Sequence, residues 1–258
     1  MSFEFCEVEA HGRLLVVTLN RPDQLNALNK AAHYELATVF DAFEETPDNW
    51  VCILTGAGKA FCAGVDLKSG PLDAAFVPNT GFAGLTHRFD RRKPIIAAVN
   101  GLALGGGFEL ALACDLVVAA EEARFGLTEA RVGLYAAAGG IQRLISEIGP
   151  KRAHAMLLTG RQVTADEGAQ LGFVNEVAPA DDLLVVAKRW AQDVLRCSPS
   201  AIAATKAIAD DSESNVRRSI EAMSNLPAVK AVSHSSDLGE GARAFAERRA
   251  PNWSNLRS

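Results

Sequence analysis

The chain has 258 residues, of which 48% are apolar, and it carries a formal net charge of −5. This length and apolar content allow one large domain or two small ones with a buried core. The acidic balance argues against a polyanion such as nucleic acid as the main partner, and without a run of about 18 apolar residues no membrane-spanning helix is expected.

Five cysteines are scattered along the chain without a Cys-x-x-Cys pair: Cys6, Cys52, Cys62, Cys114 and Cys197. An odd, scattered set of this kind is typical of reduced thiols in a cytosolic protein. The acidic stretch MSFEFCEVEA lacks the basic start and the apolar segment of a signal peptide. We therefore expect a cytoplasmic protein.

The first ninety residues alternate between strand and helix patterns. They predict strands over 3–10 and 13–20, a helix over 29–46, a strand over 51–55, a loop with glycines and prolines over 70–81 and a short helix over 84–91. The sequence GAGK at 56–59 follows the third strand but departs from the GxxxxGK[ST] phosphate loop. Lys59 is a candidate contact for a ligand phosphate, and the alternative is a surface lysine.

The same alternation continues to about residue 180. It predicts strands over 95–99, 116–120 and 173–177, a connecting loop over 125–129, helices over 108–114, 139–148 and 152–158, and a short helix that Thr164 and Glu167 cap. From Asp182 onward only helices are predicted. We therefore divide the chain into an α/β core, residues 1–180, and a helical C-terminal part, residues 181–258.

The stretch from Pro94 to Cys114 concentrates the chemistry. A buried strand is followed by Gly105-Gly106-Gly107 and then by an apolar helix whose first turn carries Glu109. The first N–H groups of a helix lack internal partners and carry partial positive charge, so they can hold a negatively charged oxygen. This indicates an oxyanion site beside a general base; the alternatives are a glycine turn with a surface glutamate, or a dinucleotide site, which the glycine spacing does not match.

A second carboxylate, Glu129, lies in the predicted loop after Thr128. By itself it is most simply a solvated or capping residue, but together with Glu109 it can share one water molecule. Adding water to a C=C bond needs a base to activate the water and an acid to protonate the neighbouring carbon. The five histidines show no metal-ligand spacing, and the GxSxG element of serine hydrolases is absent.

Six motifs together make a specific pattern: FCAGVDLK, IAAVNGLALGGGFELALACD, FGLTEARVG, GGIQRL, LTG and AFAERR. From about residue 10 onward the sequence resembles the enoyl-CoA hydratase/isomerase family, also called the crotonase family. The blocks GFAGLT and GGGFELALA look most like its carnitinyl-CoA dehydratase branch. The resemblance implies an α/β fold, a crotonase-like spiral of β-β-α turns, with a helical C-terminal part that forms trimers, often paired into hexamers.

The resemblance also implies roles for individual residues. By motif position, the backbone N–H groups of Val65 and Gly106 form the oxyanion hole. Glu109 activates the water and Glu129 gives a proton to the α-carbon. Residues that match coenzyme A contacts are Ala63, Asp66, Leu67 and Lys68, and, toward a neighbouring subunit's coenzyme A, Phe245 and Arg248. No cofactor or metal is expected, since coenzyme A is part of the substrate.

One segment departs from the family pattern. Tyr135-Ala136-Ala137 stands where many members have Ile-Pro-Gly, in a loop that lines the acyl side of the pocket. We therefore predict a hydratase of 2-enoyl-CoA thioesters that prefers short or polar-ended acyl groups. The alternatives are carnitinyl-CoA dehydration or double-bond isomerisation on the same scaffold, and a family member that binds RNA, against which the acidic balance argues.

Overall fold

The computed structural model describes residues 3–69, 76–212, 214–233 and 237–253. Two sheets form its centre, and the larger one has six strands. In spatial order these are β1 (Cys6–His11), β2 (Leu14–Leu19), β3 (Val51–Gly56), β5 (Ile95–Val99), β7 (Leu116–Ala120) and β10 (Glu176–Ala178). Every pair is parallel except β1 and β2. All residues of β3 and β5 are buried, as expected for parallel strands covered on both faces.

The smaller sheet has four strands, in the order β4 (Ala60–Cys62), β6 (Leu102–Leu104), β8 (Arg124–Gly126) and β9 (Val163–Thr164). The chain passes three times from the large sheet to the small one: β3 leads to β4, β5 to β6 and β7 to β8. After β6 it enters α2 (Gly106–Leu112), and after β8 the 3-10 helix η3 (Glu129–Val132). This repeated path is the predicted spiral of β-β-α turns.

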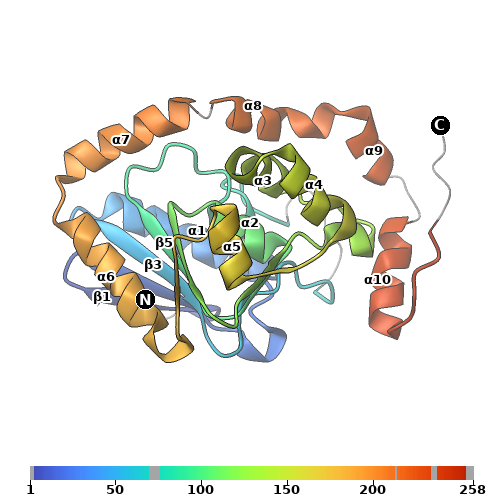
Figure 1. The fold of residues 1–258 in the computed structure, drawn as a ribbon, viewed down its shortest axis with the longest axis horizontal. Helices are drawn as coiled ribbons and strands as arrows, with labels where there is room; N and C mark the ends of the chain where they lie inside the picture. Colours follow the sequence, from blue (N-terminus) through green and yellow to red (C-terminus); the bar gives the residue numbers. More distant parts are fainter. Residues whose placement is uncertain (1–2, 70–75, 213, 234–236, 254–258) are drawn as a thin grey trace.

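Helices cover both sides of this core (Figure 1). They are α1 (Lys30–Glu45), α2, α3 (Gly140–Ile148), α4 (Pro150–Thr159), α5 (Ala165–Leu171) and α6 (Leu183–Leu195). Helix α6 buries Leu183, Ala187 and Ala191 against the large sheet. Its packing therefore belongs to the spiral, and the division of the chain at residue 180 stays a prediction about folding units.

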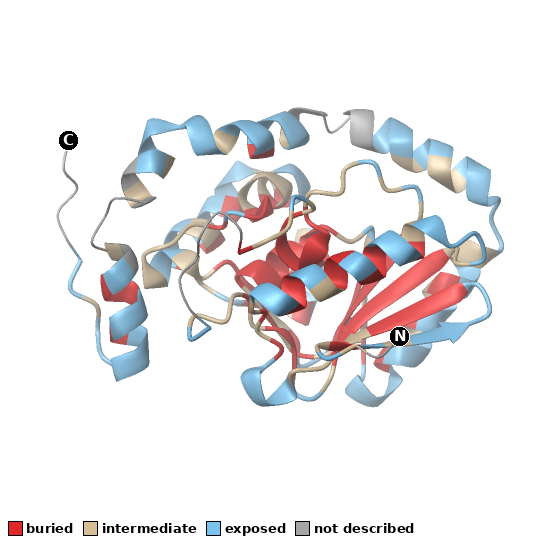
Figure 2. Ribbon diagram, turned by 180° about the vertical axis from the view of Figure 1, so that it is seen from behind, coloured by how far each residue is buried: buried red, intermediate tan, exposed pale blue. Residues whose placement is uncertain are grey.

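The remaining helices form an arm that curves around the core (Figure 1). Its elements are α7 (Pro199–Ser212), α8 (Ser214–Ala222), η5 (Met223–Asn225), α9 (Pro227–Ser233) and α10 (Asp237–Glu247). Figure 2 shows that the arm is mostly exposed, in contrast to the buried strands. A hollow of about 630 Å³ separates α7 and α8 from the core.

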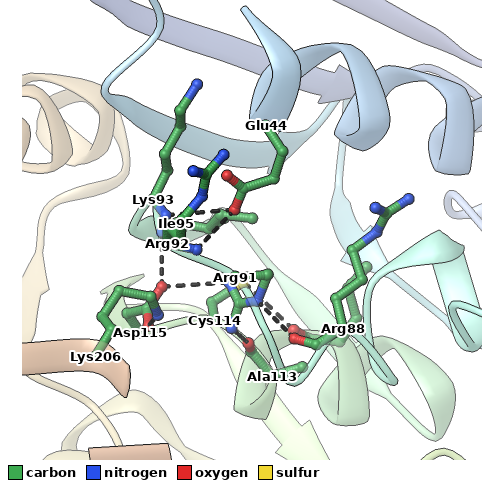
Figure 3. Close-up of polar contacts among 11 residues, drawn as sticks. Glu44, Arg88, Arg91, Arg92, Lys93, Ile95, Ala113, Cys114, Asp115 and Lys206 are labelled. Atoms are coloured by element: carbon green, nitrogen blue, oxygen red, sulfur yellow. Dashed lines mark hydrogen bonds and ion pairs between the residues drawn. The ribbon is translucent and has the colours of Figure 1, made fainter. Parts of the chain in front are cut away.

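An acidic residue at the edge of this hollow ties the arm to the core (Figure 3). Asp115 pairs with Lys206 of α7 and lies 3.3 Å from the Arg91 guanidinium. Its carboxylate also accepts a 2.8 Å hydrogen bond from the Ile95 N–H. The two cations and this hydrogen bond outweigh burial and lower the pKa of Asp115, although burial is the largest single effect. The ion pair is therefore present across the neutral pH range.

The structure confirms most predicted elements and corrects three. The helix predicted over 84–91 is wrong: the chain forms the short 3-10 helix η2 (Phe82–Gly84), because Ala83 takes a left-handed conformation with φ 53°. The predicted loop over 125–129 begins inside β8, which runs from Arg124 to Gly126. The predicted strand 173–177 is shifted to β10, because the Phe173 and Val174 N–H groups bond back to Gly168 and end α5.

Candidate active site

The first turn of α2 is the centre of the site. Gly105 precedes the helix with φ 54° and ψ −128°, a conformation open to glycine, and Gly106 is the first helical residue. All seven residues of α2 are buried, including Glu109, which is 3% exposed. Such a helix normally carries no charge, so the burial of Glu109 marks a functional position rather than a packing one.

The Glu109 carboxylate is held by backbone groups at the start of α3 and in the loop before it. Its Oε1 accepts hydrogen bonds of 2.8 Å from the N–H of Ala138 and of 2.8 Å from the N–H of Gly140. A side chain on Gly140 would overlap Glu109, since a Cβ there would lie 2.7 Å from Glu109 Cγ. The loop therefore fixes the carboxylate through contacts that need a glycine.

Glu129 has no comparable support. Both of its carboxylate oxygens are buried, and no other residue in the described part of the chain donates a hydrogen bond to them. The side chain lies beside the start of α2, since a Cβ on Gly105 would be 3.4 Å from Glu129 Oε1. The carboxylate thus lies next to the partial positive charge of the helix end.

The two carboxylates perturb each other. Burial raises the pKa of Glu109, and the hydrogen bonds from Gly140 and Ala138 and the Arg143 charge oppose this only in part. Burial, and then the nearby charge of Glu109, raise the pKa of Glu129. Like charges in a dry site resist full ionisation, so the pair retains a proton at pH values where an ordinary glutamate has lost it.

The loop 63–66 brings Val65 next to Gly106. A Cβ on Gly64 would lie 3.2 Å from the Gly106 nitrogen, so the two segments are in contact. Within the described part of the chain, neither the Val65 N–H nor the Gly106 N–H donates a hydrogen bond. The structure therefore places the two predicted oxyanion donors beside each other, with both N–H groups available to a ligand.

A second loop, residues 21–28, supports the Val65 loop. The Ala63 N–H donates to the Leu25 carbonyl at 3.0 Å, and the Asp66 N–H donates to the Leu28 carbonyl at 3.0 Å. Loop 21–28 takes its shape from the buried Asn26, which has φ 55° and whose side chain bonds three backbone groups. Backbone bonds on both sides of Val65 thus fix the direction of its N–H.

Asp66 completes this support. Its carboxylate lies 3.1 Å from the Arg21 guanidinium, and both side chains are about 15% exposed (15% for Arg21, 14% for Asp66). Asp66 also accepts a hydrogen bond of 3.2 Å from the Lys68 N–H. The side chain predicted to contact coenzyme A is therefore engaged within the protein, where it holds the loop in place.

We expect Asp66→Ala to lower kcat about tenfold with little change in KM, because a small displacement of the Val65 N–H weakens the oxyanion contact. Leaving Arg21 half-buried without its partner should also cost about 1–3 kcal/mol of stability. The measurement is kcat and KM for Asp66→Ala, Arg21→Met and the double variant. If the effects of the two single variants on kcat do not sum to the effect of the double variant, Asp66 and Arg21 act together. A rise in KM confined to Asp66→Ala would instead assign Asp66 to coenzyme A binding.

The other predicted contacts are distributed as follows. Ala63 and Leu67 are half-buried in the Val65 loop and Lys68 is exposed at its end. Lys59 is exposed in the turn before β4, whereas Val65 follows β4, so the structure does not bring Lys59 to the carboxylates.

Tyr135, Phe245 and Arg248 differ in their exposure. Burial, and then the Glu109 charge, raise the pKa of Tyr135, which is half-buried three residues before Ala138, a hydrogen-bond donor to Glu109. Phe245 is 63% exposed on α10 and Arg248 is exposed just after it, so both remain available to another subunit.

Sequence reasoning missed the residues behind Gly106. The Phe82 ring packs on Gly106, where a Cβ would lie 2.6 Å from it. The buried His33 ring lies 4.5 Å from Phe82 by ring centroids and accepts a 2.9 Å hydrogen bond from the Ala83 N–H. Burial lowers the pKa of His33 to about 4, so it is neutral at physiological pH. The sequence block GFAGLT, residues 81–86, contains Phe82 and Ala83 and was the signal from which this packing could have been predicted.

Two further features concern ligands and membranes. In the described ranges, no group of three or more histidine, cysteine, aspartate or glutamate side chains could hold a metal ion. The helices of the same ranges include none with the length and apolar character needed to cross a bilayer.

Comparison with known proteins identifies the scaffold. The family model of enoyl-CoA hydratase/isomerase matches residues 9–256. Carnitinyl-CoA dehydratase of Citrobacter koseri is 43% identical over 251 residues, which cover 94% of this chain and 95% of that protein. The crystal structure of carnitinyl-CoA hydratase from Mycobacterium avium superposes with a TM-score of 0.88 at 37% identity, covering 98% of this chain and 99% of that one.

A solved enoyl-CoA hydratase from Mycobacterium tuberculosis H37Rv is also similar, with a TM-score of 0.78 and 40% identity over 98% of this chain and 99% of that one. These relatives span almost the whole chain, so the match covers the spiral and the arm together. The predicted fold and the predicted type of enzyme, a hydro-lyase of this scaffold, are confirmed. The chain belongs to the enoyl-CoA hydratase/isomerase family.

Proposed function

We propose that this enzyme reversibly adds water across the C2–C3 double bond of short, polar-ended 2-enoyl-CoA thioesters, with Glu109 and Glu129 as its acid–base pair. The observation that carries the proposal is the juxtaposition of two buried carboxylates with two free backbone N–H groups. Glu109 and Glu129 flank the start of α2, and the N–H of Gly106 belongs to the same turn. Hydration of an activated double bond needs these groups together.

The reaction starts with the thioester carbonyl oxygen accepting hydrogen bonds from Val65 and Gly106. These donors stabilise the negative charge that develops on this oxygen when the double bond is attacked. The Glu109 carboxylate takes a proton from a water molecule, whose hydroxyl bonds to C3. The protonated Glu129 gives its proton to C2, so that the thioester has gained one water. Dehydration runs the same steps backward.

The electrostatics of the pair suit these roles. Glu109 accepts two N–H hydrogen bonds, which favour its ionised form, whereas no other described residue donates a hydrogen bond to the Glu129 oxygens. When one proton is shared, it therefore resides on Glu129, and Glu109 is the base. Since isomerisation needs only one carboxylate to move a proton, the presence of two favours addition and removal of water.

The acyl group is proposed from the relatives and from Tyr135. The similar carnitinyl-CoA dehydratases are named for a substrate with a quaternary ammonium end. Tyr135 is half-buried in the same loop as Ala138, whose N–H donates to Glu109. The face of an aromatic ring attracts quaternary ammonium groups. We therefore propose carnitinyl-CoA and crotonobetainyl-CoA as the best pair of substrates.

We expect kcat/KM to be highest for crotonobetainyl-CoA and to fall from four-carbon to eight- and sixteen-carbon 2-enoyl-CoA. Tyr135→Ile should lower kcat/KM for crotonobetainyl-CoA by about fivefold to thirtyfold, since a cation–π contact contributes roughly 1–2 kcal/mol, whereas Tyr135→Phe retains the ring and should stay near wild type. The assay follows enoyl absorbance. A preference for sixteen carbons that Tyr135→Ile leaves unchanged would return Tyr135 to simple packing.

We also propose a homotrimer or a hexamer built from two trimers. The large apolar side chains that are exposed in the described part of the chain include Leu158 at 76% on α4, Leu226 at 55% before α9 and Phe245 at 63% on α10. Light scattering at micromolar concentration should give three or six times the mass of one chain, because association covers such surfaces. A stable monomer would contradict the proposal.

Coenzyme A enters as part of the substrate, and we propose that no other cofactor, metal or nucleic acid takes part. Activity should survive gel filtration in the presence of a chelator. A cytoplasmic location is proposed from the cysteines, which are free in the part of the chain that the structure describes.

A further inference from the structure

The last helix of the arm lies directly against the segment that carries Glu129. Helix α10 buries one face that includes Gly241 and Ala244, the latter only 2% exposed. A Cβ on Gly241 would overlap the carbonyl group of Val132 and lie 2.8 Å from its Cα. Val132 is the last residue of η3, and Glu129 is the first. The two backbones are therefore closer than any residue with a side chain at 241 would allow.

Gly241 differs in this respect from the other glycine of the helix. At Gly239 a Cβ would meet nothing closer than the Arg243 guanidinium at 3.7 Å, which is an ordinary contact. Glycine inside a helix costs roughly 1 kcal/mol relative to alanine. The absence of a side chain is thus a steric requirement at Gly241 and not at Gly239.

The position of the Glu129 carboxylate depends on the backbone of η3. Among the residues that the structure describes, no other residue donates a hydrogen bond to either of its oxygens, so packing and the path of η3 orient the side chain. That path is fixed on one side by Arg131, whose Nε donates to the Thr159 carbonyl at 3.0 Å. On the other side it is fixed by α10. A displacement of α10 would therefore move Glu129.

The arm makes a similar contact near the other carboxylate. Ile220 of α8 is 4% exposed and packs on Gly139, where a Cβ would lie 2.7 Å from its Cδ1. The next residue, Gly140, donates a hydrogen bond to Glu109. Figure 1 shows α8 running over α3, while α10 lies apart from it at the end of the arm. Two separate helices of the arm thus contact the two loops that hold the carboxylates.

We propose that α10 positions Glu129 of its own subunit, with Gly241 as the positioning residue that allows the close approach to Val132. The arm then has a role in the chemistry of each subunit in addition to any role in assembly. This inference rests on the proposed function, because it takes Glu129 as the proton donor. A displaced Glu129 would gain water and lose its alignment with C2, which lowers kcat more than substrate binding.

The charged groups around Glu129 allow this displacement to be detected. Glu240 of α10 is engaged by Arg249 and Arg243, and Arg131 of η3 is bonded to a carbonyl. Glu109 of α2 is the charge that acts on Glu129. If η3 moves outward, both burial and the Glu109 charge act less on Glu129, so the alkaline limb of the kcat profile should move to lower pH.

The test compares Gly241→Ala with Gly239→Ala and with Glu129→Gln. We expect Gly241→Ala to lower kcat about tenfold or more, with KM nearly unchanged and the alkaline limb at lower pH. Hydrogen exchange should accelerate in residues 129–134 while β3 and β5 stay protected. Gly239→Ala should match the wild type in kcat, in KM, in the position of the alkaline limb and in hydrogen exchange. A folded Gly241→Ala enzyme with wild-type kcat, while Glu129→Gln is inactive, overturns the inference and leaves the proposed function intact.

A second variant keeps the test decisive if Gly241→Ala does not fold. Glu240 accepts bonds from Arg249 and from the Asn252 N–H, and so holds the segment after α10 against the helix. Glu240→Gln weakens these hydrogen bonds without adding a heavy atom at the contact between α10 and η3. Like Gly241→Ala, this variant should lower kcat and speed hydrogen exchange in residues 129–134. An unchanged kcat together with unchanged exchange would overturn the inference. If Glu129→Gln itself works at the wild-type rate, the proposed function fails and the inference fails with it.

Discussion

Glutamine in place of Glu129 is expected to lower kcat by about 100-fold or more, because the proton donor to C2 is lost. The same change should raise the melting temperature at pH 8. Burial and Glu109 raise the folded-state pKa of Glu129 above its ordinary value of 4.5. A group with a raised folded pKa contributes stability that is complete below its unfolded pKa and is lost as the pH rises through its folded pKa. Wild-type protein should therefore lose stability as the pH rises from about 4.5 through the folded-state pKa of Glu129.

The measurement is kcat together with melting temperature from pH 4 to pH 8. Glu129→Gln and wild type should melt together at pH 4 and separate above it, by about 2–4 °C for each kcal/mol of relieved charge burial. Glu122→Gln is the matched control, since Glu122 is exposed in the turn before β8 and should change neither quantity. Wild-type turnover in Glu129→Gln would remove its catalytic role.

Glu109→Gln should lose activity to a similar degree. The amide oxygen can still accept the hydrogen bonds from Ala138 and Gly140, so this variant should stay folded. Its inactivity would then reflect the missing base and not a displaced loop.

Removal of the Gly106 N–H is expected to lower kcat by about 100-fold to 1,000-fold, the usual effect of losing one oxyanion donor. Proline removes this N–H and is tolerated at the first position of a helix, and Gly106 is outside the left-handed region. The obstacle is the Phe82 ring, which a Cβ at 106 would approach to 2.6 Å. The variant is therefore made together with Phe82→Ala.

The matched control is Gly106→Ala in the same Phe82→Ala background. Both double variants add a Cβ, but only the alanine retains the N–H, so the ratio of their kcat values isolates the hydrogen bond. Circular dichroism and oligomeric state establish that both are folded. Equal kcat values for the two double variants would rule out the Gly106 N–H as an oxyanion donor.

The centre of the site could be predicted from the sequence because its residue types are unusual for their positions. Three glycines before a helix and Glu109 within an apolar helix stand out without any structure, and motif resemblance added Val65 and Glu129. The supports could not be anticipated in this way. The Ala138 and Gly140 N–H groups reach Glu109 from 29 and 31 residues away, and Arg21 reaches Asp66 from 45 residues away. Such partners depend on how the spiral brings distant segments together.

Local errors arose where tertiary contacts override local preference. Residues 84–91 have a helical pattern, yet His33 holds the Ala83 N–H and stabilises a left-handed residue there. Phe173 and Val174 look like the start of a strand, but they close the end of α5. In each case a contact with another element decides the conformation, and this contact cannot be predicted from the local sequence.

Three strands of the small sheet, β4, β6 and β8, run parallel, and this has a consequence for how the protein can diverge. Val65, Gly106 and Glu129 each follow a different strand, β4, β6 and β8, by two or three residues. The register aligns these strand ends, so the three groups meet at one edge. Insertions or deletions after the strands would shift a group along the chain and separate it from the others. The turns before the strands, such as 57–59, do not have this constraint. Changes in chain length should therefore accumulate at the entry edge of the sheet while the exit edge retains its spacing.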